Sequence, residues 1–135
     1  MCVFCKIVAK EIPASILYED ESSIAFLDIS QVTKGHTLIV PKNHVENLYN
    51  LSEQDATHLL LVASKLANVL RKTYQLEGLN MINNNGLLAG QTVNHFHIHL
   101  LPRYQVDELT IHFKQNEPNF VLLNQIKNEI QTNLK

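Results

Sequence analysis

The segment from residue 95 to residue 103 combines histidines with apolar residues in strict alternation. His95, His97 and His99 are each separated by one apolar residue. This period of two predicts a strand that presents three imidazoles on one face, about 6.5–7 Å apart along the chain, and the apolar residues on the other. A neutral imidazole can attack an electrophile, transfer a proton or bind a metal ion near neutral pH.

Three interpretations of this strand follow from the residues alone. The first is a zinc site that uses two or three of the histidines. The second is nucleophilic catalysis, in which the middle residue, His97, attacks while its neighbours arrange protons. The third is a solvent-facing strand whose polar residues happen to be histidine. A lone histidine would favour the third interpretation, but three in strict alternation disfavour it.

The chain contains a Cys-x-x-Cys pair at its start. Cys2 and Cys5 are its only cysteines, so disulfides could not staple the rest of the fold. Such a pair can be a redox centre, half of a metal site or two inert thiols. No thioredoxin-like strand–helix–strand pattern follows the pair, and the residues alone leave the alternatives open.

A polar loop is predicted just before the histidine segment, over residues 83–92. The side chains of Asn84, Gln91 and Thr92 can donate hydrogen bonds, and Gly90 allows a close backbone approach. Backbone N–H groups exposed in such a loop favour anions. The loop therefore suits a phosphate group, although an ordinary polar loop is the alternative.

Short strands and two main helices must position these residues. The polar turn at residues 20–22 predicts a hairpin between the first two strands. The strands are expected at residues 16–19, 24–27, 36–40, 79–82 and 93–103.

The helices are predicted from caps and apolar spacing. A short helix is expected within residues 2–10, and a long one opens at Ser52, which has capping-box spacing to Asp55. Gly78 is expected just beyond the end of the long helix. A second amphipathic helix is expected around residues 122–130. This order predicts an α+β domain, an antiparallel sheet with helices on one side. The apolar positions of the two helices are Leu59, Val62, Ala63, Leu66 and Leu70, then Leu122, Leu123, Ile126 and Ile130.

Composition bounds the class of protein. The 135 residues are 45% hydrophobic and 18% charged, which suits a single domain over residues 1–135 and disfavours disorder. A formal charge of −2 gives no broad basic field for nucleic acid. The longest apolar run, residues 59–63, is too short to cross a bilayer, and no secretory signal is present. We therefore expect a cytoplasmic protein with no membrane or nucleic-acid partner.

The histidine segment and four other segments together resemble the HIT (histidine triad) superfamily of nucleotide hydrolases and transferases. The signature of that family is His-x-His-x-His followed by two apolar residues. The resemblance covers roughly residues 2–103, and its motifs occur in family order. The supporting segments are residues 10–14, 26–30, 35–42 and 89–93.

The resemblance implies a fold and an assembly. HIT proteins have a five-stranded antiparallel sheet with two main helices. Two copies join into a ten-stranded sheet across a homodimer, which covers an open sheet edge. For this chain the implied interface contains the helix that opens at Ser52 and the strand near Asn80.

The resemblance also implies a reaction and its residues. HIT enzymes cleave a bond at the α-phosphorus of a nucleotide through a nucleotidyl-histidine intermediate. The implied nucleophile is His97, with His99 at the leaving group and His36 assisting; Asp28 would accept hydrogen bonds from the ribose hydroxyls. The implied nucleotide-binding residues are Phe4, Ile7, Ile12, Phe26, Leu27, Asp28, Ile29, Leu38, Asn84, Gly90, Gln91, Thr92 and Val93.

A structural zinc site is implied by bacterial HIT proteins and the related galactose-1-phosphate uridylyltransferases. Their pattern matches Cys2, Cys5, His44 and His95 in this chain. A complete Cys₂His₂ set leaves zinc no open position, so no catalytic metal is required. His95 would then be a ligand rather than a proton carrier.

The implied activity is that of a Hint-like phosphoramidase, which releases a nucleoside monophosphate from purine nucleoside phosphoramidates or related nucleotides. Residues 89–93 and 101–103 are closer to the fragile histidine triad branch, so a dinucleoside polyphosphate hydrolase is the alternative enzyme. The C-terminal tryptophan of many Hint proteins is absent. A nucleotide-binding adaptor or sensor with incidental turnover, and a zinc hydrolase, are the other candidates.

Overall fold

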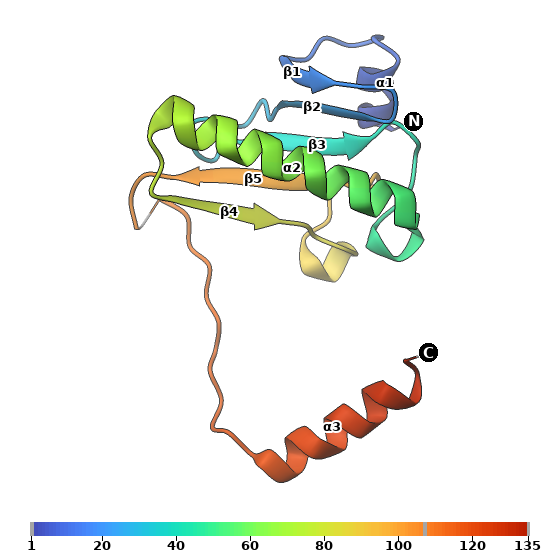
Figure 1. Cartoon of the computed structure of the whole chain (residues 1–135), viewed down its shortest axis with the longest axis vertical. Helices are drawn as coiled ribbons and strands as arrows, with labels where there is room; N and C mark the ends of the chain where they lie inside the picture. The colour runs from blue at the N-terminus through green and yellow to red at the C-terminus, as the bar shows by residue number, and fades with distance from the viewer. Residues whose placement is uncertain (1, 107, 135) are drawn as a thin grey trace.

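The computed structural model describes residues 2–106 and 108–134. Five strands form one sheet in the order β1-β2-β3-β5-β4, and every neighbouring pair is antiparallel (Figure 1). The expected five-stranded antiparallel sheet is therefore confirmed. The elements are α1 (Val3–Val8), β1 (Ile16–Glu19), β2 (Ser23–Leu27), β3 (Thr37–Pro41), the 3₁₀ turn η1 (Leu48–Asn50), α2 (Glu53–Tyr74), β4 (Gly78–Ile82), the 3₁₀ turn η2 (Leu87–Ala89), β5 (Ile98–Arg103) and α3 (Phe120–Thr132).

Helix α2 begins as its sequence predicts and ends earlier than expected. The Ser52 side chain accepts a hydrogen bond from the Asp55 N–H, which confirms the predicted cap. The helix ends at Tyr74 because Gln75 adopts a left-handed conformation with φ 53°. The sequence places Gly78 just beyond the helix end, where it would act as a cap. Gly78 is instead the first residue of β4, and Gln75 occupies the capping position.

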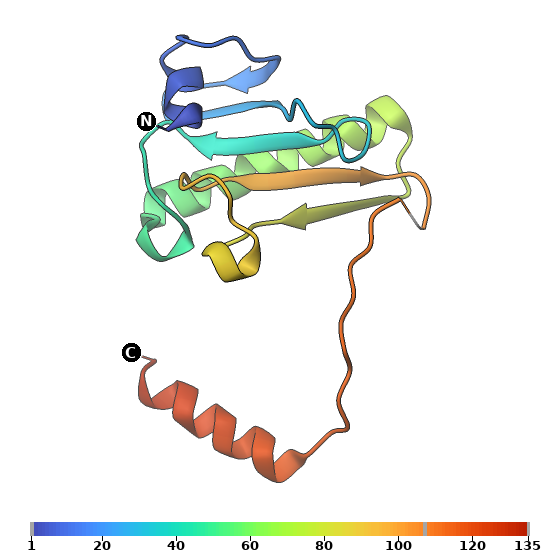
Figure 2. The same ribbon diagram turned by 180° about the vertical axis from the view of Figure 1, so that it is seen from behind.

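The two faces of the sheet are covered by different helices. Helix α2 lies on one face, whereas α1 lies on the opposite face beside β2 (Figures 1 and 2). The expectation of helices on one side is therefore wrong, because the short N-terminal helix has its own apolar side chains to bury. The core on the α1 face contains Phe4, Ile7, Ile24, Phe26, Leu38 and Val40. The core on the α2 face contains Ala25, Ile39, Leu59, Val62, Ala63, Leu66, Leu70, Phe96, Ile98 and Leu100.

Strand β5 is shorter than the alternating pattern predicts. It begins at Ile98 rather than Val93, so His99 is the only histidine of the triad within it. The ladder with β3 stops because Pro41 ends β3 and has no N–H to donate. The preceding residues follow an irregular path, in which the Phe96 N–H donates to the Val45 carbonyl. Side chains nevertheless keep alternating, since every second residue from Phe96 packs in the α2 core.

The second amphipathic helix forms, but it does not pack on the sheet. Asn119 caps α3 by accepting a hydrogen bond from the Leu122 N–H. Residues 110–119 form an extended segment that leads away from the end of β5, and α3 lies beyond the β4 edge (Figures 1 and 2). Every residue of α3 is exposed, so it adds nothing to the core of this chain.

Across residues 2–106 and 108–134, no helix combines the length and apolar character needed to cross a membrane.

Candidate active site and metal centre

A cavity of about 280 Å³ lies between α1, the end of β2 and the start of β5. Most of the predicted nucleotide-binding residues line it, together with His97 and His99. Its apolar wall and its polar end suit a molecule with a flat apolar part and a charged part. The lining residues are Val3, Phe4, Ile7, Ile12, Pro13, Ala14, Phe26, Leu27, Asp28, Ile29, Leu38, Thr92, Val93, His97 and His99.

The ring of His97 is held by a backbone carbonyl. Its Nδ1 lies 2.8 Å from the carbonyl oxygen of His95. Because a carbonyl oxygen only accepts, Nδ1 carries the proton and Nε2 carries the lone pair. Phe4 supports the same ring edge-on, at 5.1 Å between ring centroids. The fold therefore presents His97 as a neutral imidazole with one nitrogen available as a nucleophile.

His36 and His99 form a hydrogen-bonded pair with a defined direction. The Val32 N–H donates to Nδ1 of His36 at 3.3 Å, so the proton of His36 is on Nε2. This Nε2 lies 2.9 Å from Nδ1 of His99, to which it donates. The proton of His99 is therefore on its other nitrogen, Nε2. The chain of bonds leaves the Nε2–H of His99 as a hydrogen-bond donor.

Burial keeps these imidazoles neutral. Desolvation lowers the pKa of His36 and of His97 below the usual 6.5. Desolvation, together with the neighbouring His97 and His36, lowers the pKa of His99 to about 4. Neutral rings are the forms required for nucleophilic attack and for the directed hydrogen bonds.

Asp28 sits at the polar end of the cavity, just after β2. Its Oδ1 accepts a hydrogen bond from the Ser30 N–H at 2.8 Å. Its Oδ2 lies 3.6 Å from Nε2 of His36. The carboxylate is half-buried and retains acceptor capacity toward a ligand. Asp28, His36 and His99 also bring one ligand atom each within 4.8 Å of one another, so they form a compact polar group.

The predicted phosphate loop is only partly at the cavity. Thr92 and Val93 line it, whereas Asn84, Gly90 and Gln91 do not. The Gln91 side chain is buried and fully used by the loop. Its Nε2 donates to the carbonyls of Glu46 and Val93, and its Oε1 accepts from the Gly86 N–H. Gln91 therefore stabilises the loop, and its amide has no free N–H for the phosphate contact expected from the sequence.

Several residues of the site escaped prediction from the sequence. Asn83 donates from Nδ2 to the His97 carbonyl at 2.9 Å and so fixes the backbone of the triad. Asn85 in turn donates to Asn83. The polar residues that start at Asn83 pointed to a functional loop. A hydrogen bond to a backbone carbonyl, however, cannot be recognised from residue types in the sequence. Val3, Pro13 and Ala14 extend the apolar wall.

The four predicted metal ligands come together beside the cavity. Cys2, Cys5, His44 and His95 each bring one ligand atom within 4.8 Å of the others. Nδ1 of His95 lies 3.4 Å from Sγ of Cys2 and 3.6 Å from Sγ of Cys5. Nδ1 of His44 lies 3.3 Å from Sγ of Cys5. His95 is completely buried.

The chemistry of this donor set fits zinc. Zinc–sulfur bonds of about 2.3 Å and zinc–nitrogen bonds of about 2.1 Å place neighbouring tetrahedral donors about 3.6 Å apart. The observed sulfur–nitrogen distances of 3.3–3.6 Å agree with that value. Nε2 of His95 donates to the Pro41 carbonyl at 2.8 Å, which leaves its Nδ1 lone pair directed at the thiols. Such a carbonyl partner is typical of a metal-ligating histidine.

Comparison with known proteins agrees with this geometry. The HIT domain family model matches residues 9–106. A Bacillus subtilis relative, "Protein hit", is 52% identical over 103 residues, which are 76% of this chain and 71% of the relative. Adenosine 5'-monophosphoramidase HNT1 of Saccharomyces cerevisiae is 36% identical over 135 residues, 99% of this chain and 83% of the enzyme.

Solved structures match the whole path of the chain. A crystal structure of a Streptococcus mutans protein has a TM-score of 0.95 and 51% identity, covering 99% of this chain and 85% of that one. A histidine triad nucleotide-binding protein from Candida albicans has a TM-score of 0.92 and 33% identity, covering 99% of this chain and 97% of that one. With the family model matched over most of its length, the chain belongs to the HIT family.

Proposed function

We propose that this HIT-family nucleotide hydrolase cleaves purine nucleoside phosphoramidates, or closely related nucleotides, at the α-phosphate. The observation that carries the proposal is the fixed tautomer of His97, whose Nδ1 proton is donated to the His95 carbonyl. Its Nε2 lone pair borders the cavity and can attack phosphorus. The relationship to the yeast adenosine 5'-monophosphoramidase supports the substrate class.

In the first step of the proposed reaction, Nε2 of His97 bonds to the α-phosphorus. The phosphorus–nitrogen bond to the leaving amine breaks, and its electron pair stays on the amine. The amine takes up one proton from bulk solvent, and the Nε2–H of His99 donates a hydrogen bond to the leaving nitrogen. The product on the enzyme is a nucleotidyl-His97 adduct, whose positive ring is stabilised through the Nδ1–H bond to the His95 carbonyl.

In the second step, water attacks the same phosphorus and the bond to His97 breaks. The attacking water gives up one proton to the solvent, and His97 departs as the starting neutral imidazole. A nucleoside monophosphate is released. One proton is thus taken from the solvent in the first step and returned in the second, while His36 and His99 keep their tautomers and act by hydrogen bonding.

The cavity is proposed to bind the ribose, the base and the phosphate of the substrate at three different places. Asp28 accepts hydrogen bonds from the ribose hydroxyls. Phe4, Phe26 and Leu38 lie around the base, and Thr92 lies at the phosphate end. An apolar slot of this kind contacts the faces of purines without strong discrimination between adenine and guanine.

The proposed assembly is a homodimer in the cytoplasm. Strand β4 is an edge strand, and pairing of two β4 edges would extend the sheet to ten strands. Leu60 of α2 and Met81 of β4 are exposed apolar residues on the two elements that the proposed interface uses. Bound zinc is proposed to tie the N-terminal helix to His95, with Cys2, Cys5 and His44 as the other ligands.

The test combines a substrate panel with trapping of the intermediate. Single-turnover reactions with a labelled adenosine phosphoramidate should give a covalent adduct on the peptide that contains His97. Steady-state kinetics should give the highest kcat/KM for phosphoramidates among these, diadenosine polyphosphates and nucleotide sugars. A preference for diadenosine polyphosphates would favour the alternative hydrolase. Binding without any adduct would favour a nucleotide sensor.

A further inference from the structure

Helix α3 exposes a row of apolar side chains that nothing in the same chain covers. Leu122, Leu123, Ile126 and Ile130 recur at helical spacing and are 39–61% exposed. Among the described residues, the hydrogen bonds of α3 are all local to the helix and its cap. An amphipathic helix gains most of its stability from burying its apolar face, so this helix requires a partner surface.

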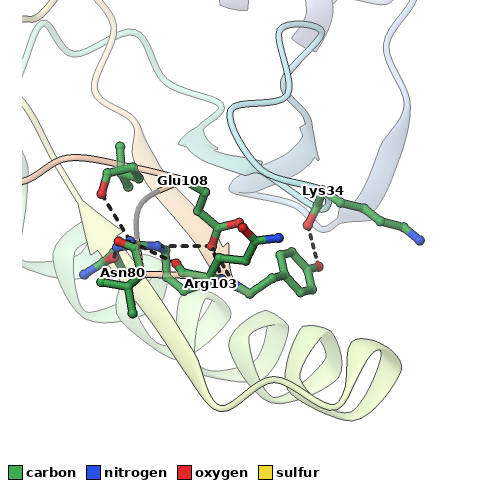
Figure 3. Close-up of polar contacts among 8 residues, drawn as sticks. Lys34, Asn80, Arg103 and Glu108 are labelled. Atoms are coloured by element: carbon green, nitrogen blue, oxygen red, sulfur yellow. Dashed lines mark hydrogen bonds and ion pairs between the residues drawn. The ribbon is translucent and has the colours of Figure 1, made fainter.

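Polar contacts fix the residues that directly follow β5 and begin the segment leading to α3. Arg103 donates to Asn80 Oδ1 at 2.6 Å and to the carbonyl of Leu109 at 3.1 Å, and pairs with Glu108 at 3.4 Å (Figure 3). Tyr104 donates to the Lys34 carbonyl at 2.7 Å (Figure 3). These contacts direct residues 110–119 past the β4 edge instead of back onto their own sheet (Figure 1).

The direction of this segment is shared with a solved relative. The Streptococcus mutans structure matches with a TM-score of 0.95 over 99% of this chain. That coverage includes residues 110–132, and a helix placed elsewhere would lower the score. Residues 110–132 follow the same course in both proteins although they do not pack on their own domain. We take this as an indication that another molecule holds the segment in place.

The surface of the domain offers a matching apolar groove. A hollow of about 380 Å³ lies between the C-terminal half of α2 and the β2–β3 loop. Its lining includes Leu17, Leu27, Leu66, Val69, Leu70 and Tyr74. The groove is at the end of the sheet from which the chain leaves β5, since Tyr104 contacts Lys34 there. Helix α3 runs back toward the opposite end (Figure 1).

We propose that α3 of each copy docks into this groove of a second copy. The inference rests on the proposed β4–β4 dimer. Antiparallel pairing of two β4 edges requires a twofold axis that reverses the partner, so the partner's groove would lie at the end opposite to this copy's own groove, which is the end toward which α3 runs (Figure 1). Both copies then bury one apolar helix and one apolar groove, and the contact is used twice.

The exchange would also support the active site of the partner. Gln31 lines the groove, and its side chain holds the β2–β3 loop together. Its Nε2 donates to the carbonyls of Asp28 and His36 at 2.6 and 2.8 Å, and its Oε1 accepts from the Gly35 N–H at 2.8 Å. A helix packed on the groove would therefore restrain the loop that carries Asp28 and His36 toward the ligand.

Disulfide trapping between two differently tagged proteins tests the proposal. One carries Ile126→Cys, the other Val69→Cys, and the unsubstituted protein reports background from Cys2 and Cys5. Mild oxidation of the mixture should give a cross-linked pair that contains both tags. Absence of that pair would overturn the proposal. So would a double variant in which residues 69 and 126 cross-link within one chain.

A second experiment separates the exchange from the dimer and from the activity. Leu123→Glu with Ile126→Glu disrupts the apolar face, and Asn124→Glu with Asn128→Glu adds the same charge to the other face. The first pair should raise KM for a ribonucleotide substrate at least about 3-fold, and the second should leave it unchanged. Equal effects of both pairs would overturn the docking. Light scattering of the unsubstituted protein tests the dimer independently, and adduct formation tests the reaction.

Discussion

Two neighbouring regions of this protein use histidines from one short segment for opposite purposes. At the metal centre, the carbonyl of Pro41 occupies Nε2 of His95, and Nδ1 faces two thiols. In the cavity, the carbonyl of His95 occupies Nδ1 of His97, and Nε2 is left for the substrate. The residue type is the same, and its position differs by two. The backbone group that holds one ring nitrogen therefore decides the role of the other.

The surroundings of the two regions reinforce this difference. The metal centre is a closed set of four donors, which suits a structural ion with no open coordination position. The cavity has an open apolar wall, a carboxylate and two neutral imidazoles. Only the second arrangement provides room for a ligand. Changes in the first region should alter stability most, and changes in the second should alter rate most.

The largest expected effect is on the rate, from His97→Ala. Turnover and adduct formation should fall at least about 10³-fold, because the only proposed nucleophile is removed. Binding of a nucleoside monophosphate should remain within a few-fold. His112→Ala, which removes an exposed histidine, is the matched control. Single-turnover kinetics and equilibrium binding measure both effects, and near-normal turnover in His97→Ala would refute the mechanism.

The next effect is on stability, from Cys5→Ser at the metal centre. The protein purified without added metal should contain one zinc per chain, and the variant should contain much less. Its melting temperature should fall by at least about 5 °C, since metal binding contributes directly to folding. Ala9→Ser, an exposed change at the end of α1, is the control. Zinc content that does not change in Cys5→Ser would exclude this ligand set.

A smaller effect is expected at the ribose end of the cavity. Asp28→Ala should weaken binding of a ribonucleotide by about 1.5–3 kcal/mol, because it removes a charged acceptor from two hydroxyl groups. Binding of the corresponding deoxyribonucleotide should change less. Titration calorimetry with both sugars measures the difference, with Glu21→Ala as a control carboxylate on the surface. Equal losses for the two sugars would assign Asp28 a structural role.

The smallest effect is a pH dependence of stability that originates in the cavity. Burial lowers the pKa of His99 from 6.5 to about 4. Between pH 6.5 and pH 4, His99 is therefore protonated in the unfolded chain and neutral in the folded chain. The free energy of unfolding should therefore decrease by about 1–3 kcal/mol as the pH falls from 6.5 to 4.

Circular dichroism during urea unfolding measures this dependence. The comparison is best made in the Cys5→Ser background, where loss of metal at low pH does not contribute. His99→Gln should flatten the decrease between pH 6.5 and 4. An unchanged slope in that variant would contradict the assignment of the effect to His99.

Patterns of side chains predicted much of this molecule, and backbone contacts were the part they missed. The apolar stripe of α2 and the hairpin of β1 and β2 follow directly from spacing. The early part of the predicted fifth strand failed, because side chains from Phe96 alternate between faces even where no ladder forms. Burial alternation alone cannot distinguish a paired strand from an irregular extended segment.

The candidate site shows the same division. Residue types that act through their own side chains, such as His97 and Asp28, were predicted to lie together, and they line one cavity. Asn83 and Gln91 act through backbone carbonyls whose positions depend on the folded loop. No spacing rule encodes such contacts. The face covered by α1 was also missed, since a helix of six residues carries too short a pattern to assign its side.

The ring of Phe4 belongs to both regions, and this gives the protein a thermodynamic connection between them. It packs edge-on against His95 at 5.8 Å and against His97 at 5.1 Å between ring centroids. If zinc fixes α1 and with it the cavity wall, metal occupancy raises the affinity for nucleotide. Linkage is reciprocal, so a bound nucleotide must raise the affinity for zinc by the same factor. Substrate-loaded molecules would then retain their metal when zinc is scarce, and idle ones would lose it first.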